Sequence, residues 1–257
     1  MTQGLFMYHG PMTREDCRIS VNGEMLLLDA SGALWWPAEK TLVVADLHFE
    51  KGSAYARSGQ LLPPYDTRNT LQRLEKAISR FCPARVVALG DSFHDAKADE
   101  RLDAEEIVLL GRLTERVEWL WLEGNHDPKP PGWLGGKIVG ETAISGLVFR
   151  HIPARLHSRG EVAGHLHPCV SVHRNGLSVR RRCFLCDGTR LVLPAYGAYA
   201  GGLDIRDKAV TELFEDGFAA YALGRDRVYA VAAQALLRKK KVEPQPSKPA
   251  IKTVARP

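Results

Sequence analysis

Three apolar runs of this chain end on side chains that bind metals, and this arrangement limits the folds open to it. The runs cover residues 41–45, 85–89 and 117–122, and they have the length and composition of buried strands. The segments that follow them are Asp46-Leu47-His48, Gly90-Asp91 and Gly124-Asn125-His126-Asp127. Helical periodicity between the runs predicts an α/β layered fold. In an open α/β sheet the carboxyl ends of the strands form the ligand crevice, so we expect the three motifs to meet there.

The second half of the chain adds three histidines in similar settings. His151 lies in FRHIP, and His165 and His167 lie in GHLHP. In an extended segment alternate side chains point the same way, so D-x-H and H-x-H each predict a pair that grips one site from one side. Three glycines of the motifs allow sharp turns and a close approach of the backbone to a ligand. They are Gly90, Gly124 and Gly164.

Each motif alone has a plainer explanation. An aspartate at the end of a strand is usually a turn residue or a helix cap, and D-x-H often occurs by chance. Here, however, all the motifs follow one another in order at the ends of predicted elements. Together they predict a metal site rather than a set of unrelated caps and core residues.

The remaining pattern predicts short strands and a few helices. Residues 18–36 read as strands joined by turns at 22–23 and 31–32. From Lys137 onward the pattern is β-rich and predicts a second sheet packed against the first. The predicted helices run from a cap at Asp66 or Thr67 to Phe81, over residues 98–115, and near 207–213 or Leu236. No linker composition separates the halves, so we expect one domain over residues 1–237 and a tail over 238–257.

The net charge of +5 belongs to that tail. Residues 238–257 hold seven Lys or Arg and one Glu, a charge of +6, which leaves −1 for the rest of the chain. The tail also holds four prolines and few large apolar residues, so we expect it to be disordered. Two roles stay open for it: a weak electrostatic arm for nucleic acid, or a solubility tail.

Composition also bears on the compartment. No apolar run approaches the roughly 18 residues that a membrane span needs, and the first residues, MTQGLFMYHG, do not resemble a secretory signal. Five cysteines, an odd number, argue against a disulfide framework. Cys183 and Cys186 have zinc-like spacing but lack a second pair, so we expect core cysteines. The sequence thus predicts a cytoplasmic protein without a membrane partner.

At the polar motifs the chain resembles the calcineurin-like binuclear metallophosphoesterases. That superfamily carries D-x-H, G-D, G-N-H-D or G-N-H-E, a single His, and G-H-x-H in this order, and all five are present here. The resemblance implies a double β-sandwich flanked by helices, with metals at the carboxyl-terminal strand edges. Strings such as ADLHFEKGSAYARSGQLLPPYDT, GEVAGHLHP and LPAYGAYAGGL, within residues 18–235, look like one bacterial clade. Its members accompany an ATP-dependent DNA ligase and a large helicase, and are described as DNA-damage-response endonucleases.

The resemblance also implies two sets of ligands. The first metal would be held by Asp46, His48, Asp91 and His167. The second would be held by Asp91, Asn125, His151 and His165, with Asp91 bridging. Two divalent ions and two aspartates leave a charge of +2, which suits a hydroxide and a phosphodiester oxygen. Nitrogen and oxygen ligands without thiolate favour Mn, Fe or Zn, and the clade favours Mn.

Other residues are candidates for catalysis or substrate binding. His126 follows a ligand and is expected to face the substrate, either as the general acid or as a stabiliser of the transition-state charge; both roles stay open. Asp127 is expected to orient its imidazole and raise its pKa. His94 and Arg57 are candidate substrate residues, although an exposed loop or helix face would explain them as well. Weaker candidates for nucleic-acid contact are Tyr55, Trp133 and the arginines at 174, 180–182 and 190.

The expected function is a Mn-dependent phosphodiesterase that nicks DNA, single-stranded or flexible, in DNA repair. The chemistry follows from the site, whereas DNA, the ligase and the helicase follow from the resemblance. One alternative is a phosphatase or cyclic-nucleotide phosphodiesterase of the same superfamily. Another is a metal-free scaffold or DNA-binding subunit of a ligase and helicase assembly, against which the intact ligand set argues.

Overall fold

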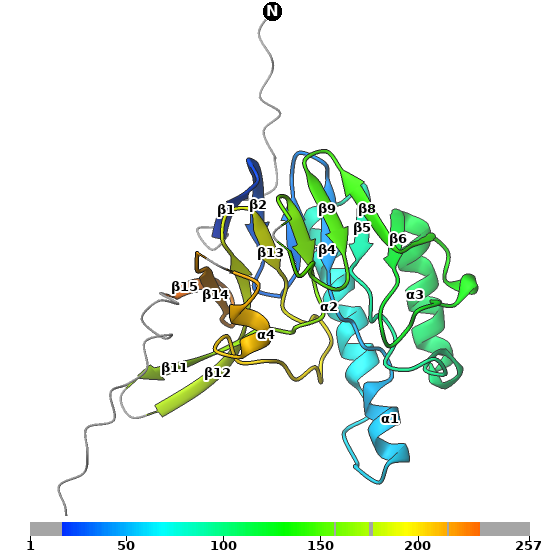
Figure 1. The fold of residues 1–257 in the computed structure, drawn as a ribbon. Helices are drawn as coiled ribbons and strands as arrows, with labels where there is room; N and C mark the ends of the chain where they lie inside the picture. Colours follow the sequence, from blue (N-terminus) through cyan, green and yellow to red (C-terminus); the bar gives the residue numbers. More distant parts are fainter. Residues whose placement is uncertain (1–16, 157, 175–176, 215, 232–257) are drawn as a thin grey trace, which may run out of the picture.

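The computed structural model describes residues 17–231, apart from 157, 175–176 and 215. The predicted tail at 238–257 and the alternative helix near Leu236 lie outside the described residues. Within the described part, two β-sheets stand face to face with helices on the outside (Figure 1).

The first sheet has seven strands in chain order. They are β1 (Cys17–Val21), β2 (Glu24–Leu28), β3 (Leu34–Trp36), β4 (Thr41–Val44), β5 (Arg85–Ala88), β6 (Glu118–Leu122) and β7 (Lys137–Val139). The strands predicted in 18–36 and the three apolar strands are confirmed. β1 to β4 pair antiparallel, and β4 to β7 pair parallel, with Val43 opposite Val87. One expectation was wrong: β7 joins this sheet, because it pairs with β6, although the β-rich pattern from Lys137 suggested the second sheet.

The second sheet has the order β15-β14-β12-β13-β10-β9-β8, and β11 pairs with β12. Its strands are β8 (Glu141–Ile144), β9 (Leu147–Arg150), β10 (Glu161–Ala163), β11 (Cys169–Arg174), β12 (Leu177–Cys186), β13 (Arg190–Val192), β14 (Ala219–Leu223) and β15 (Val228–Val231). β10 runs parallel to both of its neighbours, β9 and β13. The carboxyl end of β10, where GHLH follows, is therefore held from both sides.

Four α-helices and two short 3₁₀ turns complete the described residues. They are α1 (Lys51–Arg57), α2 (Asp66–Phe81), α3 (Ala104–Arg116), α4 (Lys208–Thr211), and the turns η1 (Asp99–Arg101) and η2 (Gly132–Leu134). α2 ends where predicted, but Tyr65 is its N-cap rather than Asp66 or Thr67. The Asp66 carboxylate instead accepts a hydrogen bond from the Gly52 N–H of α1, at 2.9 Å.

α3 begins later than the sequence pattern suggested, at Ala104 instead of residue 98. The reason is a capping box, in which the Asp103 side chain accepts from the Glu106 N–H and the Glu106 side chain accepts from the Asp103 N–H. Such a reciprocal cap fixes the first turn of a helix at that point. The short helix α4 lies within the predicted 207–213 segment.

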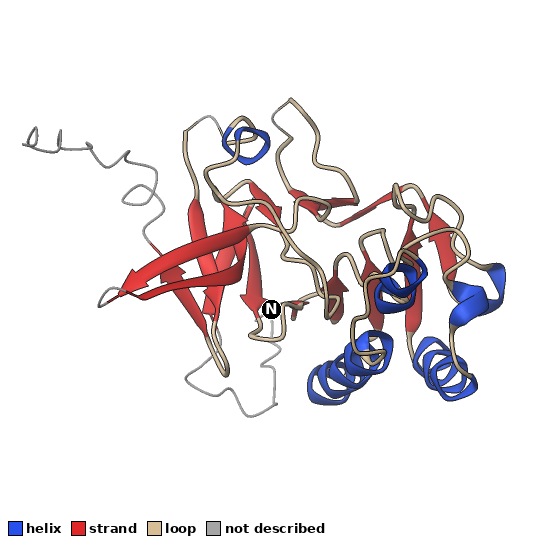
Figure 2. Cartoon of the chain, turned by 90° about the horizontal axis from the view of Figure 1, so that it is seen from below, coloured by secondary structure: helices blue, strands red, loops and turns tan. Residues whose placement is uncertain are grey.

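The core is divided into three layers by the two sheets. The first lies between α2, α3 and the first sheet, and includes Trp35, Leu74 and Trp119. The second lies between the sheets, and the third covers the outer face of the second sheet near α4. Figure 2 shows α2 and α3 side by side along one face of the first sheet. The expected double β-sandwich flanked by helices is thus confirmed.

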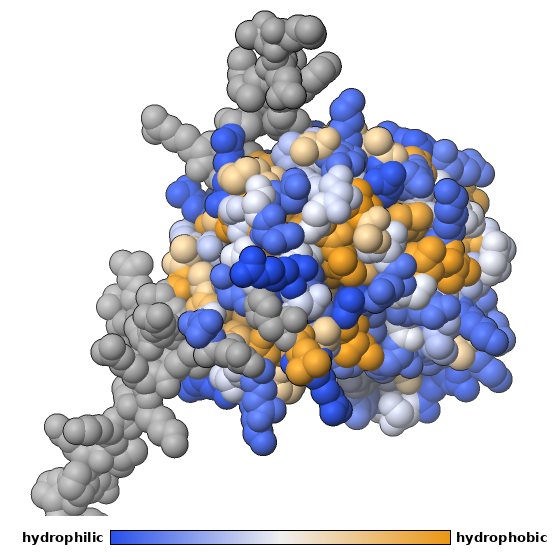
Figure 3. Space-filling view, turned by 45° about the horizontal axis from the view of Figure 1, so that its top comes forward, coloured by the Kyte–Doolittle hydropathy of each residue, from blue (hydrophilic) through white to orange (hydrophobic). Residues whose placement is uncertain are grey.

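The surface and the buried cysteines fit this layered core. On the face shown in Figure 3, hydrophobic residues gather toward the middle and hydrophilic ones form most of the outline. Cys183 and Cys186 are buried and unpaired, as expected for core cysteines. No helix among the described residues is long and apolar enough to cross a membrane.

Candidate metal centre

The predicted ligand residues follow strands of both sheets at one end of the sandwich. Asp46 comes two residues after β4, Asp91 three residues after β5, and Asn125 three residues after β6. His151 directly follows β9, and His165 comes two residues after β10. The carboxyl ends of strands in both sheets therefore contribute candidate ligands, as the position of the motifs predicted.

The backbone of these segments differs from the extended form expected for D-x-H and H-x-H. At five candidate ligands the backbone is in the left-handed region. The φ angles are 54° at Asp46, 46° at His48, 47° at Asp91, 71° at His165 and 47° at His167. This region is disfavoured for residues other than glycine, so the turns hold strain, as functional sites often do. The expectation that one H-x-H pair grips one site was wrong, because this curled backbone sends His165 and His167 into different clusters.

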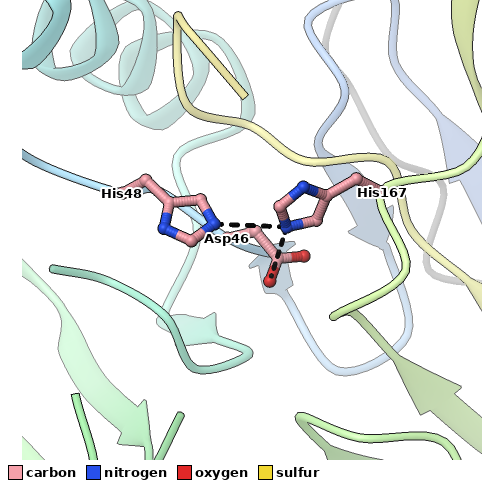
Figure 4. A group of neighbouring side chains, drawn as sticks. All are labelled: Asp46, His48 and His167. Atoms are coloured by element: carbon pink, nitrogen blue, oxygen red, sulfur yellow. Dashed lines mark hydrogen bonds and ion pairs between the residues drawn. The ribbon is translucent and has the colours of Figure 1, made fainter. Parts of the chain in front are cut away.

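The first cluster contains Asp46, His48 and His167, with one ligand atom of each within 4.8 Å of the others. Figure 4 shows the two imidazole rings turned toward each other beside the Asp46 carboxylate. His48 Nε2 lies 3.2 Å from His167 Nε2, which lies 3.3 Å from Asp46 Oδ1. The His165 N–H donates to Asp46 Oδ2 at 2.9 Å and so holds the carboxylate in place.

The second cluster contains Asp91, His151 and His165. His151 Nε2 lies 3.4 Å from Asp91 Oδ1, 3.2 Å from His165 Nδ1 and 2.8 Å from the side-chain oxygen of Asn125. The other ring nitrogen of His151 lies 2.8 Å from the Leu89 carbonyl oxygen. A proton on Nδ1 donates to that carbonyl and leaves the Nε2 lone pair for a metal, the usual outer support of a histidine ligand.

Asp91 lies between the two clusters. One of its oxygens faces His151, and the other lies 3.9 Å from His48 Nε2 of the first cluster. The His126 N–H donates to Asp91 Oδ1 at 2.8 Å and fixes the carboxylate. This position is compatible with the bridging role that the resemblance implies, and that role stays a prediction.

The electrostatics keep most of these groups in the form that binds metal. Burial, followed by the charges of His167 and Lys51, lowers the pKa of His48 to about 2. Burial likewise lowers the pKa of His165. Burial acts to raise the pKa of Asp91, but the hydrogen bond and charge of His151 outweigh it and hold that pKa well below the usual range. The reciprocal contact with Asp91 raises the pKa of His151 against its burial.

The donor set fits two divalent metal ions. Asp46 and Asp91 are buried, yet among the described residues no Lys or Arg forms an ion pair with either. Each cluster brings two imidazole nitrogens to 3.2 Å from one another, close enough to share a proton or to bind one cation together. A carboxylate oxygen lies 3.3 Å from a histidine nitrogen in the first cluster and 3.4 Å in the second. Divalent cations bind this combination of nitrogen and oxygen ligands, so each cluster can hold a metal.

Two glycines make the close packing of the centre possible. A Cβ on Gly124 would come within 2.1 Å of the Asp91 backbone nitrogen and 2.4 Å of an Asp127 carboxylate oxygen. A Cβ on Gly90 would come within 2.6 Å of the His151 ring, and Gly90 has a φ of +72°. These positions therefore pack tightly against the centre, whereas the expected close approach of the backbone to a ligand stays a prediction.

His126 lies at the exposed side of the centre, but Asp127 does not orient it as predicted. The His126 Nε2 atom is 3.9 Å from Asp91 Oδ2, and its Nδ1 lies 2.9 Å from the carbonyl oxygen of His94. Asp127 is buried and accepts a hydrogen bond from the Phe93 N–H at 3.0 Å. Burial raises the pKa of Asp127 to about 7. The carboxylate turns inward to hold the loop after β5, and the His94 carbonyl takes the orienting role.

The candidate substrate residues lie in two places. The His94 ring stacks on His126, with centroids 5.2 Å apart, and Tyr55 of α1 stacks on His94 at 6.0 Å. Burial, followed by the charge of Lys51, lowers the pKa of His94 to about 4. Arg57 is exposed at the last position of α1, and its predicted contact with substrate stays a prediction. Sequence reasoning missed Lys51, whose place three residues after His48 was the available signal.

The arginine cluster is mostly structural. Arg190 is fully buried, and its Nε pairs with Glu161 at 2.5 Å, so it is not free to hold DNA phosphates. Arg180 donates to the Gly202 carbonyl. The side chain of Arg174 is outside the described residues, and Arg181 is exposed. Only part of the run therefore faces solvent, as its strand position implied.

The segment 195–200 has a supporting role that sequence reasoning did not assign. Arg182 donates to the carbonyl oxygens of Ala195 at 3.0 Å and Ala198 at 2.8 Å. The same segment also holds the loop after β4 that carries Asp46. The Tyr196 N–H donates to the Ala45 carbonyl oxygen, and the Gly197 N–H donates to the Asp46 carbonyl oxygen. The carbonyl-binding arginine was visible in RRRCFL, but its partners are distant in sequence.

A cavity of about 530 Å³ lies away from this centre, between β1 and β14. Arg18, Asp187 and Tyr221 are among the residues that line it, and it contains none of the predicted site residues. The residues predicted to bind metal or act in catalysis therefore lie outside this cavity.

Comparison with known proteins gives one line of support. No protein-family model matches the chain, and no curated protein matches it significantly. Among solved structures it is similar to the nuclease MPE of Pseudomonas putida, with a TM-score of 0.66 and 27% sequence identity. The match covers 84% of this chain and 100% of that chain. The chain thus has a metallophosphoesterase-like fold with two adjacent clusters that can hold metal ions.

Proposed function

We propose that this chain is a metal-dependent phosphodiesterase that acts as a DNA endonuclease on single-stranded DNA. The observation that carries the proposal is the pair of adjacent Asp/His clusters that meet at Asp91. The structural similarity of the chain to a nuclease, over the full length of that nuclease, supports phosphodiester cleavage. DNA repair, and a ligase and helicase as partners, are proposed from the resemblance of the sequence alone.

The proposed reaction is hydrolysis of a phosphodiester. Two divalent ions, with Mn²⁺ proposed as the native metal, would supply an activated water and neutralise charge on the phosphate oxygens. The first would be held by Asp46, His48, Asp91 and His167, and the second by Asp91, Asn125, His151 and His165. The carboxylates are fixed for this role by the N–H groups of His165 and His126.

His126 is proposed to act on the leaving oxygen. Its Nδ1–H donates to the His94 carbonyl, which fixes the ring, and its Nε2 faces the centre beside Asp91. When the ring is protonated, Nε2–H donates to the departing oxygen or to the charge on phosphorus. His94 stacks on the ring and limits its rotation.

The test is cleavage of end-labelled single-stranded DNA beside bis-p-nitrophenyl phosphate, a generic diester, with Mn²⁺, Mg²⁺, Zn²⁺ or EDTA. We expect both substrates to be cut with Mn²⁺ and neither with EDTA. Cleavage of the small diester alone would retain the metal site and refute DNA as the substrate. Purified protein without metal and without activity would favour the scaffold alternative.

A further inference from the structure

Lys51 has a position that neither the fold nor the metal centre explains. It is the first residue of α1, three residues after His48, and its side chain is half-buried. Among the described residues, no carboxylate forms an ion pair with its ammonium group. Its Nζ lies 6.0 Å from the centroid of the Tyr55 ring, one turn along the helix.

Three arginines near the centre are already engaged. Arg182 donates to carbonyl oxygens of the segment 195–200, and Arg73 donates to the Tyr196 carbonyl. Arg101 holds Asp95 at 2.6 Å and Ser53 at 2.8 Å. Lys51 is thus a half-buried cation near the centre that forms no ion pair with a side chain of the described residues.

The ammonium group lies within the electrostatic field of the metal centre. Burial, followed by the charge of Arg182, lowers the pKa of Lys51, and the carboxylates of Asp46 and Asp91 oppose that shift. Its charge in turn lowers the pKa of His48 and His94. Two divalent ions on these ligands would leave the centre with a positive charge, so Lys51 would face a cation rather than an anion. Such an arrangement destabilises the free protein and becomes favourable when a polyanion binds.

A continuous row of rings connects Lys51 to the reacting end of the site. Tyr55 stacks on His94 with an interplanar angle of 25°, and His94 stacks on His126 with an angle of 20°. His126 Nε2 faces Asp91 at the far end of the row. A strand whose scissile phosphate lies at the metals would therefore have α1 and Lys51 beside its next nucleotides.

We propose that Lys51 binds a non-scissile phosphate of the nucleic-acid strand, as a subsite built on α1 beside the metal centre. A lysine suits this task because its ammonium is a compact charge on a flexible stem that follows a mobile backbone. The inference rests on the proposed nuclease function and extends it, since it requires a substrate with at least two phosphates.

The test compares Lys51→Gln, Lys51→Arg and the wild type on a single-stranded oligonucleotide and on bis-p-nitrophenyl phosphate, with Mn²⁺. The small diester has one phosphate and cannot reach the subsite. We expect Lys51→Gln to raise KM for the oligonucleotide about tenfold and to reduce the slope of log affinity against log salt by about 0.7. Both constants for the small diester should change much less than those for the oligonucleotide, and Lys51→Arg should restore most of the oligonucleotide affinity. Lys76→Gln removes the same charge from an exposed position of α2 and serves as the control.

The outcomes separate this inference from the function on which it rests. Equal losses on both substrates, or altered metal content of Lys51→Gln, would place Lys51 at the metals and overturn the subsite. Unchanged oligonucleotide kinetics and salt slope would overturn it as well. A wild type that cuts the small diester but no oligonucleotide would refute the nuclease proposal itself, and the subsite with it.

Discussion

Two polar clusters of this molecule contain buried carboxylates whose partners differ. In the second sheet, Glu161 of β10 and Arg190 of β13 are both 0% exposed and pair at 2.5 Å. The Arg190 guanidinium also donates to the carbonyl oxygens of Ala154, Leu156 and Leu213, and the Ala154 N–H donates to Glu161. This cluster satisfies its charges with its own partners.

In the metal centre the aspartates are buried as well, whereas His165 and His167 are partly exposed, and histidines take the place of arginine beside the carboxylates. Its two aspartates have no Lys or Arg partner among the described residues, and its histidine nitrogens face one another at 3.2 Å. Burial of charge alone therefore does not mark a functional site. What distinguishes the metal centre is the convergence of carboxylate oxygens and imidazole nitrogens, both of which are metal ligands.

The largest effect is expected when a carboxylate charge is removed from the metal centre. Asp91→Asn keeps an oxygen for the His126 N–H but removes the charge shared by the clusters. We expect loss of metal and at least about a thousandfold slower cleavage, because bound metals contribute several kcal/mol. In chelator the variant should unfold below the wild-type temperature, because the contacts with His151 and the His126 N–H that hold the pKa of Asp91 low also stabilise the fold. Metal analysis by mass spectrometry and calorimetry would check this; a variant that retains both metals would contradict it.

Removal of His126 separates catalysis from metal binding. His126→Ala takes away the ring that faces Asp91 but leaves every predicted ligand in place. We expect turnover to fall about 10²- to 10⁴-fold, the usual range for a lost general acid, with unchanged metal content. Steady-state kinetics and metal analysis on the same preparation measure both quantities. Metal loss equal to that of Asp91→Asn would show that His126 is a ligand.

The self-satisfied cluster should respond in the opposite way. Arg190→Met leaves Glu161 buried without its main partner, so we expect the free energy of unfolding to fall by about 3–5 kcal/mol. Metal content per folded molecule should be unchanged. Denaturant unfolding measures the loss, and the double variant with Glu161→Gln should recover part of it. A single variant as stable as the wild type would remove the distinction between the clusters.

A buried carboxylate outside both clusters gives the smallest expected effect, which varies with pH. Burial raises the pKa of Glu106 to about 7 from 4.5, so the folded state holds a proton there that the unfolded state loses earlier. Its contribution to stability is present below about pH 4.5 and is lost as the pH rises to about 7. Glu106→Gln should remove this dependence, a difference of about 1–2 kcal/mol once solvent screening is allowed for. Unfolding of both proteins at pH 5 and pH 8 measures it; parallel pH profiles would contradict it.

The sequence predicted the strands and the positions of the ligand residues because both follow from local patterns. Apolar runs show where buried strands end, and the ends of neighbouring strands meet at one edge. It mispredicted Asp127, because adjacency to His126 does not show where a side chain points in a turn. It gave no indication of the left-handed backbone at His165 and His167, or of the burial of Arg190. The partner of Arg190, Glu161, is 29 positions away in the chain but directly opposite in the register of β10 and β13.

The division of each metal cluster between two sheets has a consequence for how the protein is made. Asp46, His48 and Asp91 follow strands of the first sheet, whereas His151, His165 and His167 follow strands of the second. A growing chain that has completed only the first sheet holds two of the three residues of the first cluster and one of the three of the second, so neither set is complete. The proposed cleavage activity should therefore arise only after the second sheet has docked, and an unfinished or partly degraded chain should lack it.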